Sequence, residues 1–99
     1  MAYTDDDDDG FDWDDTNIDH IARHGVFVDE VMDAFMDPQA VQLHARKGGN
    51  GRWAFVARTP AGRTLFVVYT RRSERVRVVT TRDAAPRESA FYRRHRGKR

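Results

Sequence analysis

The feature that most restricts the fold is a β-hairpin signal at residues 64–82, TLFVVYTRRSERVRVVTTR. Residues 64–70 are rich in β-branched and aromatic side chains, residues 71–74 interrupt that pattern, and residues 75–81 resume it. Regular alternation in the second strand predicts one side with Val76, Val78 and Thr80, and another with Arg75, Arg77, Val79 and Thr81. The first side suits a core. The arginines of the second suit phosphate binding, or simply a solvated strand face that discourages aggregation.

Further strands are predicted just before this hairpin. Residues 52–58 (RWAFVAR) alternate, and residues 59–62 (TPAG) have the composition of a type I turn that leads into the hairpin. Residues 40–45 (AVQLHA) also alternate, and residues 46–51 form a basic, glycine-rich stretch that we expect to be a flexible loop. The sequence therefore predicts an antiparallel meander of three or four strands.

Helical periodicity appears on both sides of the strands. Apolar side chains recur at helical spacing over residues 16–24, which Gly25 would end, and again over residues 28–35, which Pro38 would follow. A short edge strand is expected at residues 11–13, and Asp83 is the predicted N-cap of a last helix that contains Pro86 in its first turn. We predict an α+β fold: two N-terminal helices, an antiparallel sheet of three to four strands with the helices on one face, and a C-terminal helix.

Charge is divided unevenly along the chain. Residues 1–37 contain thirteen acidic residues and one basic residue, for a net charge of −12, whereas residues 38–99 contain sixteen basic and three acidic residues, for +13. A basic segment of this kind points to an anionic partner, most commonly nucleic acid, whereas the acidic part is compatible with a role in solubility alone. We expect residues 1–10 to be a disordered acidic tail, residues 11–96 a single domain, and residues 97–99 a basic tail.

Several chemistries lack the residues that they require. The chain has no cysteine, so it has no disulfide, thiol nucleophile or thiolate metal site. His20 and His24 have a spacing that can bind a metal, but no accompanying carboxylate pattern supports it, so we predict neither a metal nor another cofactor. No apolar run is long enough for a membrane span and no secretory signal is visible, so we expect a cytosolic protein with no membrane partner.

Metal-independent RNA cleavage remains compatible with this composition. RNA supplies its own nucleophile, the 2′-hydroxyl, so the protein must align the scissile phosphate, stabilise charge on the phosphorane and assist proton transfer. Arginine is suited to the charge-stabilising role because its guanidinium group matches two phosphate oxygens. Trp53 and Tyr92 are candidates for stacking on unpaired bases, although each is also expected to pack within the fold.

Seven local patterns, in order, resemble the BrnT toxins of bacterial type II toxin–antitoxin systems, within the RelE-like ribonuclease group. They are FDWDDTN at 11–17, HIARHGV at 20–26, VMDAFMDP at 31–38, RWAFV at 52–56, LFVVYTRR at 65–72, RVRVVTTRDA at 75–84 and RESAFY at 87–92. The similarity spans residues 11–94. The sequence departs from the family pattern at Arg23, at Asn50-Gly51 and at Thr80-Thr81.

The resemblance implies a RelE-like fold and a small ribonuclease that inhibits translation. It also implies a cognate antitoxin, usually a DNA-binding protein of the ribbon-helix-helix type, and a possible hetero-oligomer formed through it. We predict His24 as a proton-transfer group, Arg52, Arg77 and Arg82 as binders of the phosphate and transition state, and Thr70 as a hydrogen-bond donor. The predicted RNA-binding residues are Arg58, Arg71, Arg72 and Tyr92.

Two other hypotheses remain open on the sequence alone. One is a catalytically inactive relative that binds RNA or the ribosome. The other is a protein-interaction domain whose basic surface receives an acidic partner. RNA cleavage in the presence of EDTA separates the first hypothesis, an active endoribonuclease, from both of these.

Overall fold

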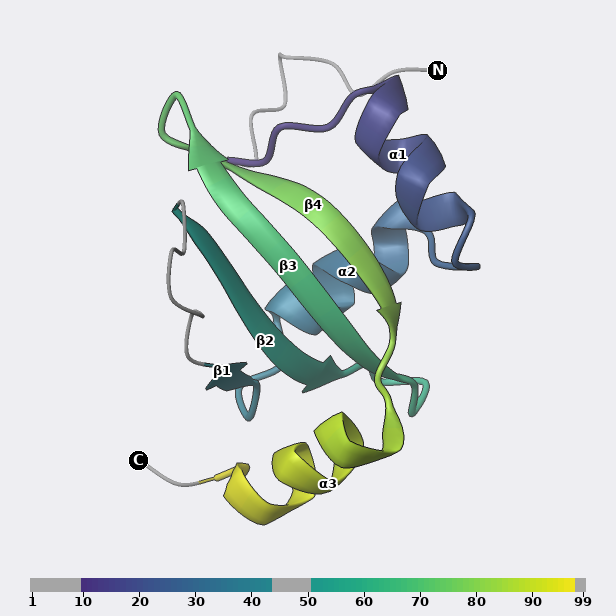
Figure 1. The fold of residues 1–99 in the computed structure, drawn as a ribbon, viewed down its shortest axis with the longest axis vertical. Coiled ribbons are helices and arrows are strands. Elements are labelled where there is room, and N and C mark those ends of the chain that lie inside the picture. Colours follow the sequence, from purple (N-terminus) through teal and green to yellow (C-terminus); the bar gives the residue numbers. More distant parts are fainter. Residues whose placement is uncertain (1–9, 44–50, 98–99) are drawn as a thin grey trace.

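The computed structural model describes residues 10–43 and 51–97 of the chain. Its elements are α1 (Asp15–Ala22), α2 (Val28–Phe35), β1 (Val41–Leu43), β2 (Arg52–Arg58), β3 (Thr64–Arg72), β4 (Arg75–Asp83) and α3 (Pro86–His95) (Figure 1). This order confirms the predicted α+β fold. Most of the predicted acidic tail (1–10), basic loop (46–51) and basic tail (97–99) lies outside the described residues, as do the last two positions of the strand predicted at 40–45. None of the described helices is long and apolar enough to cross a membrane.

The four strands form one antiparallel sheet in the order β1-β2-β3-β4, as the predicted meander requires. β3 and β4 are joined by Ser73 and Glu74, whose φ angles are +54° and +65°. Two consecutive residues in this left-handed region are typical of the tight type I′ hairpin turn. The predicted four-residue interruption at 71–74 was therefore wrong, because Arg71 and Arg72 belong to β3.

A bulge in β4 changes which side chains reach the core. The register of β3 and β4 shifts between Val68 and Tyr69, so Val79 has no partner residue on β3. Beyond the bulge Thr81 lies on the buried side of the sheet and is fully buried, whereas Thr80 lies on the other side. The predicted sides of these two threonines were wrong, since unbroken alternation had been assumed. The buried hydroxyl of Thr81 makes no hydrogen bond within the described residues.

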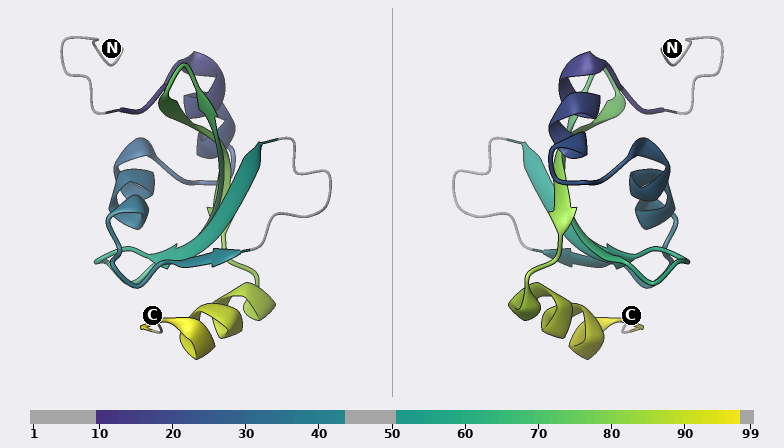
Figure 2. Two further views of the ribbon diagram at one scale, coloured as in Figure 1. Left: turned by 90° about the vertical axis from the view of Figure 1, so that its left-hand side faces the viewer. Right: turned by 90° about the vertical axis from the view of Figure 1, so that its right-hand side faces the viewer.

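The hydrophobic core lies between one face of the sheet and the two N-terminal helices. Figure 2 shows α1 and α2 beside this face, while α3 lies across the lower end of the sheet rather than beside them. The prediction that all helices cover one face was therefore wrong for α3. The core cluster consists of Ile21, Val26, Val31, Ala34, Phe55, Ala57, Leu65, Val67 and Val78. We call the opposite side of the sheet, which carries Arg52 and Thr70, the open face.

Two helix ends differ from the prediction. α1 ends at Ala22, two residues before the predicted end at His24. α3 is capped by Ala85, whose N–H donates to the Glu88 carboxylate at 2.7 Å, rather than by Asp83. Asp83 instead ends β4 and forms a 2.7 Å ion pair with Arg63, because strand pairing extends two residues further than the alternating pattern indicated.

Candidate nucleic-acid interface

Three predicted site residues form a row across the open face of the sheet. Arg52 on β2 is the register partner of Thr70 on β3, which is the partner of Arg77 on β4. Neighbouring strands lie about 4.8 Å apart, so the Cα atoms of the two arginines are separated by about 10 Å. The Thr70 hydroxyl donates to the carbonyl of Gly51 at 2.8 Å. Arg52 is exposed and has no ion-pair partner among the described residues. We call these three residues the arginine–threonine row.

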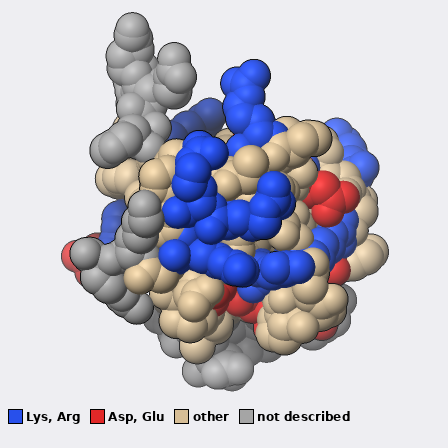
Figure 3. Space-filling view, turned by 90° about the horizontal axis from the view of Figure 1, so that it is seen from below, with Lys and Arg blue, Asp and Glu red and all other residues tan. Residues whose placement is uncertain are grey.

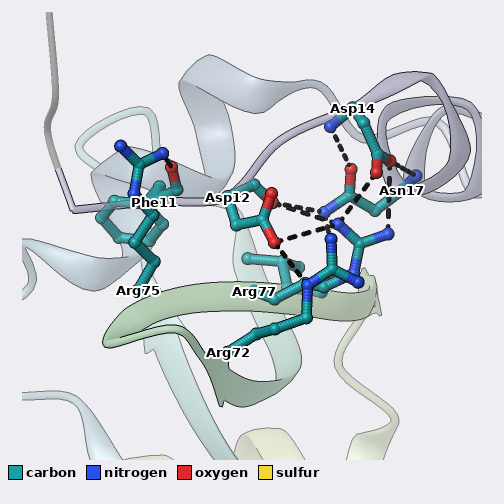
Figure 4. A network of polar contacts seen from close by, with 8 residues as sticks. Phe11, Asp12, Asp14, Asn17, Arg72, Arg75 and Arg77 are labelled. Atoms are coloured by element: carbon teal, nitrogen blue, oxygen red, sulfur yellow. Dashed lines mark hydrogen bonds and ion pairs between the residues drawn. The ribbon is translucent and has the colours of Figure 1, made fainter. Parts of the chain in front are cut away.

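Carboxylates from the N-terminal segment hold Arg77 in place (Figure 4). Its Nη1 lies 3.1 Å from Asp14 Oδ2 and 3.5 Å from Asp12 Oδ2, and its side chain is 16% exposed. The hydrogen bond from Arg77 is the main reason why the pKa of Asp14 is held below its ordinary value. Arg72 also binds Asp12, with Nε 3.0 Å from Oδ2. We call Asp12 and Asp14 the anchoring aspartates.

The backbone of residues 10–14 fixes the anchoring aspartates beside β4. The Asp12 N–H donates to the Val76 carbonyl at 2.8 Å, and the Val76 N–H donates to the Gly10 carbonyl at 2.8 Å. The buried side chain of Asn17 donates to the carbonyls of Asp12 and Val78, at 3.0 and 3.1 Å. The short edge strand predicted at 11–13 is thus present only as an isolated bridge to β4. These contacts make Arg77 part of the connection between the N-terminus and the sheet.

The anchoring aspartates were not recognised as site residues from the sequence. Their partner arginine is more than sixty positions away, so no local spacing reveals the contact. The only signal was the alternation of aromatic and acidic residues in FDWDD, which predicts the edge strand at 11–13. Asp14 is also the N-cap of α1, because its side chain accepts from the Asn17 N–H at 3.2 Å.

Arg82 connects the open face to α3. It is the register partner of Phe66, four residues along β3 from Thr70, which is about 13 Å. Its Nη1 and Nη2 donate to the two carboxylate oxygens of Glu88 at 2.8 and 2.9 Å, and its guanidinium lies 4.2 Å from the Phe66 ring centroid. These hydrogen bonds lower the pKa of Glu88 and raise that of Arg82. Arg82 is half-exposed, but the two nitrogens that could bind a phosphate in a bidentate way already donate to Glu88.

His24 does not reach the arginine–threonine row. It is exposed and follows α1 on the helical side of the sheet, where the next residue, Gly25, accepts a hydrogen bond from Arg63. Arg63 directly precedes β3, and Thr70 lies seven residues further along the chain, about 23 Å away. The described structure therefore gives no support to proton transfer by His24 at the row.

The remaining predicted RNA-binding residues have different environments. Tyr92 is buried and its hydroxyl donates to Asp37 Oδ2 at 2.8 Å; burial is the main cause of its raised pKa. Arg58, at the other end of β2, donates its backbone N–H to the same carboxylate oxygen at 2.8 Å, and its side chain is exposed. Tyr92 therefore anchors α3 and is not accessible for stacking on a base, whereas the Arg58 side chain faces solvent.

Arginines also gather on α3. Arg87, Arg93 and Arg94 are exposed and form no ion pair within 4 Å among the described residues; we call them the α3 arginines. Figure 3 views the molecule from the end where α3 lies and shows a broad group of basic side chains there. A cleft of about 350 Å³ lies between the ends of α2 and β2 and the helix α3, with Met36, Arg58 and Arg96 in its lining.

The described residues contain no group of three or more His, Cys, Asp or Glu side chains placed to hold a metal ion. The arrangement can instead hold a polyanion by arginine and hydroxyl contacts. The model of the family described as "Ribonuclease toxin, BrnT, of type II toxin-antitoxin system" matches residues 13–88. The chain belongs to this family. No curated protein matches the chain.

Membership of the BrnT family confirms the resemblance seen in the sequence. The matched region begins at Trp13 and ends at Glu88. It therefore contains the whole arginine–threonine row, together with Arg82 and its partner Glu88. A toxin of a type II system has an antitoxin partner, so this BrnT protein has one as well.

Proposed function

We propose that this BrnT toxin is a metal-independent endoribonuclease that inhibits translation by cutting RNA at the open face of the sheet. The observation that carries the proposal is the arginine–threonine row, because strand pairing alone brings Arg52, Thr70 and Arg77 side by side. Residues fixed on paired strands are held more rigidly than residues on loops, which is what a site that aligns a phosphate requires.

The proposed reaction uses the RNA as its own nucleophile. The 2′-oxygen attacks the adjacent phosphorus as its proton leaves, the bond to the 5′-oxygen breaks, and that oxygen takes up a proton. The products are a 2′,3′-cyclic phosphate and a 5′-hydroxyl. Arg52 has a free guanidinium to bind the phosphate oxygens, and Arg77 supplies a fixed positive charge on the other side of Thr70. The protein's main contribution is stabilisation of the charge that develops on the phosphorane.

Arg82 has a supporting part in this proposal. Its hydrogen bonds to Glu88 hold α3 against the end of β4, so that the α3 arginines stay fixed relative to the open face. Arg58, Arg71 and the α3 arginines attract the RNA by their charge. Removal of Arg82 would therefore weaken both stability and RNA binding.

Analysis of the cleavage products tests the proposal. Total RNA is incubated in EDTA with folded, antitoxin-free protein, and the ends of the fragments are identified. We expect 2′,3′-cyclic phosphate ends from the wild type and at least a 100-fold slower reaction with Arg52→Ala, about 2.7 kcal/mol of transition-state stabilisation. Arg23→Ala is the matched control, since Arg23 is exposed on the helical side. Intact RNA with the wild type would overturn the proposal.

A binding module without catalysis is the second candidate. It is favoured by the position of His24, because the described residues place no histidine at the arginine–threonine row. Such a module would bind RNA tightly in EDTA and leave it uncut over hours, and Arg52→Ala would weaken binding without any change in the products.

We also propose that the antitoxin is a ribbon-helix-helix DNA-binding protein that covers the basic surface. The charge of the C-terminal part of the chain suits an acidic covering segment. Co-expression with the protein encoded in the neighbouring reading frame tests this. A stable complex that no longer binds RNA is expected, and a complex with unchanged RNA binding would contradict it.

A further inference from the structure

Trp53 is an unusual surface residue. Among the described residues, the exposed large hydrophobic side chains are Phe27 at 63%, Met36 at 78% and Trp53 at 38%. Phe27 and Met36 flank α2, whereas Trp53 lies in the sheet, one residue after Arg52 in β2. It is therefore the one of the three that directly adjoins the arginine–threonine row.

Other aromatic side chains pack against the Trp53 ring and hold it in place. It stacks on Tyr69, its register partner on β3, with a centroid distance of 5.8 Å and an angle of 25° between the planes. Tyr69 in turn meets the edges of Phe35 and Phe55, at 5.5 and 5.9 Å. A ring held in this way loses little conformational freedom when a ligand stacks on it, so stacking is favoured.

The surroundings of Trp53 are cationic. Arg52 and Arg71 are both exposed and have no ion-pair partner among the described residues. Arg71 follows Tyr69 by two positions on β3, so its side chain leaves the sheet on the same side as Tyr69 and Trp53. Within the described residues β1 pairs with β2 only as far as Ala54, so no described strand lies beside Trp53 on the side away from Tyr69.

We propose that Trp53 is a stacking platform for one unpaired base of the RNA, next to the phosphate held by the arginine–threonine row. This inference rests on the proposed function for the position of that phosphate. Neighbouring residues of a strand point to opposite faces, so Arg52 and Trp53 emerge on the two sides of the same end of β2. An RNA strand that passes around this end places a phosphate on Arg52 and the next base on Trp53.

The charges favour RNA over a protein partner as the occupant. An aromatic ring with one exposed arginine, Arg71, on its own side of the sheet and a second, Arg52, at the same strand end suits single-stranded nucleic acid, because the ring accepts the base and the arginines bind the backbone phosphates. An antitoxin that covered Trp53 would need to bring acidic groups to Arg52 and Arg71.

Binding of a short, unstructured RNA with a 2′-O-methyl group on every ribose tests the proposal, since this RNA cannot be cleaved. We expect Trp53→Ala to weaken binding by about fivefold or more, and Trp53→Phe to restore most of it, because a stacked base contributes about 1–3 kcal/mol. Phe27→Ala is the matched control, since it removes a more exposed aromatic ring at the N-cap of α2, which Glu30 links to Arg63 at the opposite end of β3 from the row. That control should bind like the wild type.

A second readout does not depend on whether Trp53→Ala folds. The same RNA should quench tryptophan fluorescence of the wild type, and this quenching should disappear in Trp53→Phe, in which only Trp13 remains. Equal RNA affinity of Trp53→Ala and the wild type would overturn the proposal, as would an equal loss with Phe27→Ala or a wild type that does not bind this RNA. Loss of antitoxin binding alone in Trp53→Ala would assign the residue to the protein interface and also overturn it.

The outcome for Trp53 is separate from that for catalysis. If the wild type cleaves RNA but Trp53→Ala binds the methylated RNA normally, the stacking proposal fails and the ribonuclease proposal stands. If the methylated RNA binds in a Trp53-dependent way but unmodified RNA stays intact, the stacking proposal stands and the ribonuclease proposal fails.

Discussion

Arginines lie at both ends of this sheet, and the two groups differ in what neutralises them. At the β3–β4 turn, Arg72 and Arg77 contact the anchoring aspartates at 3.0 to 3.5 Å. On α3, the arginines face solvent and form no ion pair among the described residues. The first group is bound to carboxylates of its own chain, whereas the second group leaves its charge available to an external polyanion.

This difference shows that arginine content alone does not define an RNA-binding surface. Arg77 has two functions in our account, because it holds the N-terminal segment to β4 and contributes its charge to the row. Within the described residues, the α3 arginines form no ion pair that holds the fold together. Two of them, Arg93 and Arg94, lie in the last helical turn, where positive charge suits the helix dipole. Mutation of the arginines bound to the anchoring aspartates should therefore affect stability, whereas mutation of the α3 arginines should affect RNA affinity with little change in stability.

The largest expected effect on stability is that of Arg77→Ala. This change removes the closest cation of Asp14 and one of the two arginines that contact Asp12, and it should lower the free energy of unfolding by about 2 kcal/mol. Arg94→Ala, an exposed arginine on α3, is the matched control and should stay within about 0.5 kcal/mol of the wild type. Urea unfolding measures both, and equal losses would contradict the distinction between the two groups.

A smaller effect is expected where Arg82 ties β4 to α3. Glu88→Gln should lower the free energy of unfolding at pH 7 by about 1 kcal/mol, because the charge-assisted hydrogen bonds become neutral ones. The folded-state pKa of Glu88 lies below its ordinary value of 4.5, so its contribution is present above pH 4.5 and is lost as the pH falls through the lowered pKa.

Unfolding measured from pH 7 downward checks this sign. The difference between the wild type and Glu88→Gln should shrink as the solution becomes acidic. Asp14 and Asp83, whose pKa values are also lowered by arginine hydrogen bonds, should leave a residual acid destabilisation in the variant. A difference that grows at low pH would contradict the assigned role of the Arg82–Glu88 pair.

The smallest effect on stability, and a clear one on binding, is expected for Arg93→Gln/Arg94→Gln. The free energy of unfolding should be unchanged within about 0.5 kcal/mol. The plot of log affinity for RNA against log salt concentration has a negative slope, and the magnitude of this slope should decrease by about 1 to 2. Binding isotherms at several salt concentrations give this slope. An unchanged slope would remove α3 from the RNA-binding surface.

Local patterns predicted the elements better than they predicted the contacts between them. The bounds of β2 follow from the alternation of RWAFVAR, and the order of all seven elements was predicted correctly. The bulge at Val79 could not be seen, because adjacent valines and adjacent threonines in RVRVVTTR allow the alternation to continue in either phase. Asp83 resembled an N-cap because the sequence does not show that Arg63 binds it.

For the candidate site, the sequence indicated which residue types take part, whereas the tertiary structure determines which of them lie together and which are buried. Arg52 and Thr70 were predicted as site residues from the sequence, but their pairing depends on the register of β2 and β3. The contact of Arg77 with Asp14 joins residues that no local pattern relates. Tyr92 was proposed for RNA binding because tyrosine suits both burial and stacking, and only the tertiary structure shows that it is buried.

The central claim is that RNA bound at the arginine–threonine row is cut by its own 2′-hydroxyl. The most direct test uses an RNA with one mapped cleavage position and an otherwise identical RNA that carries a single 2′-deoxynucleotide immediately before that bond. In EDTA the account predicts that cleavage at this position disappears while the affinity for the RNA stays unchanged. Continued cleavage of the deoxy-substituted RNA at the same bond would contradict the account.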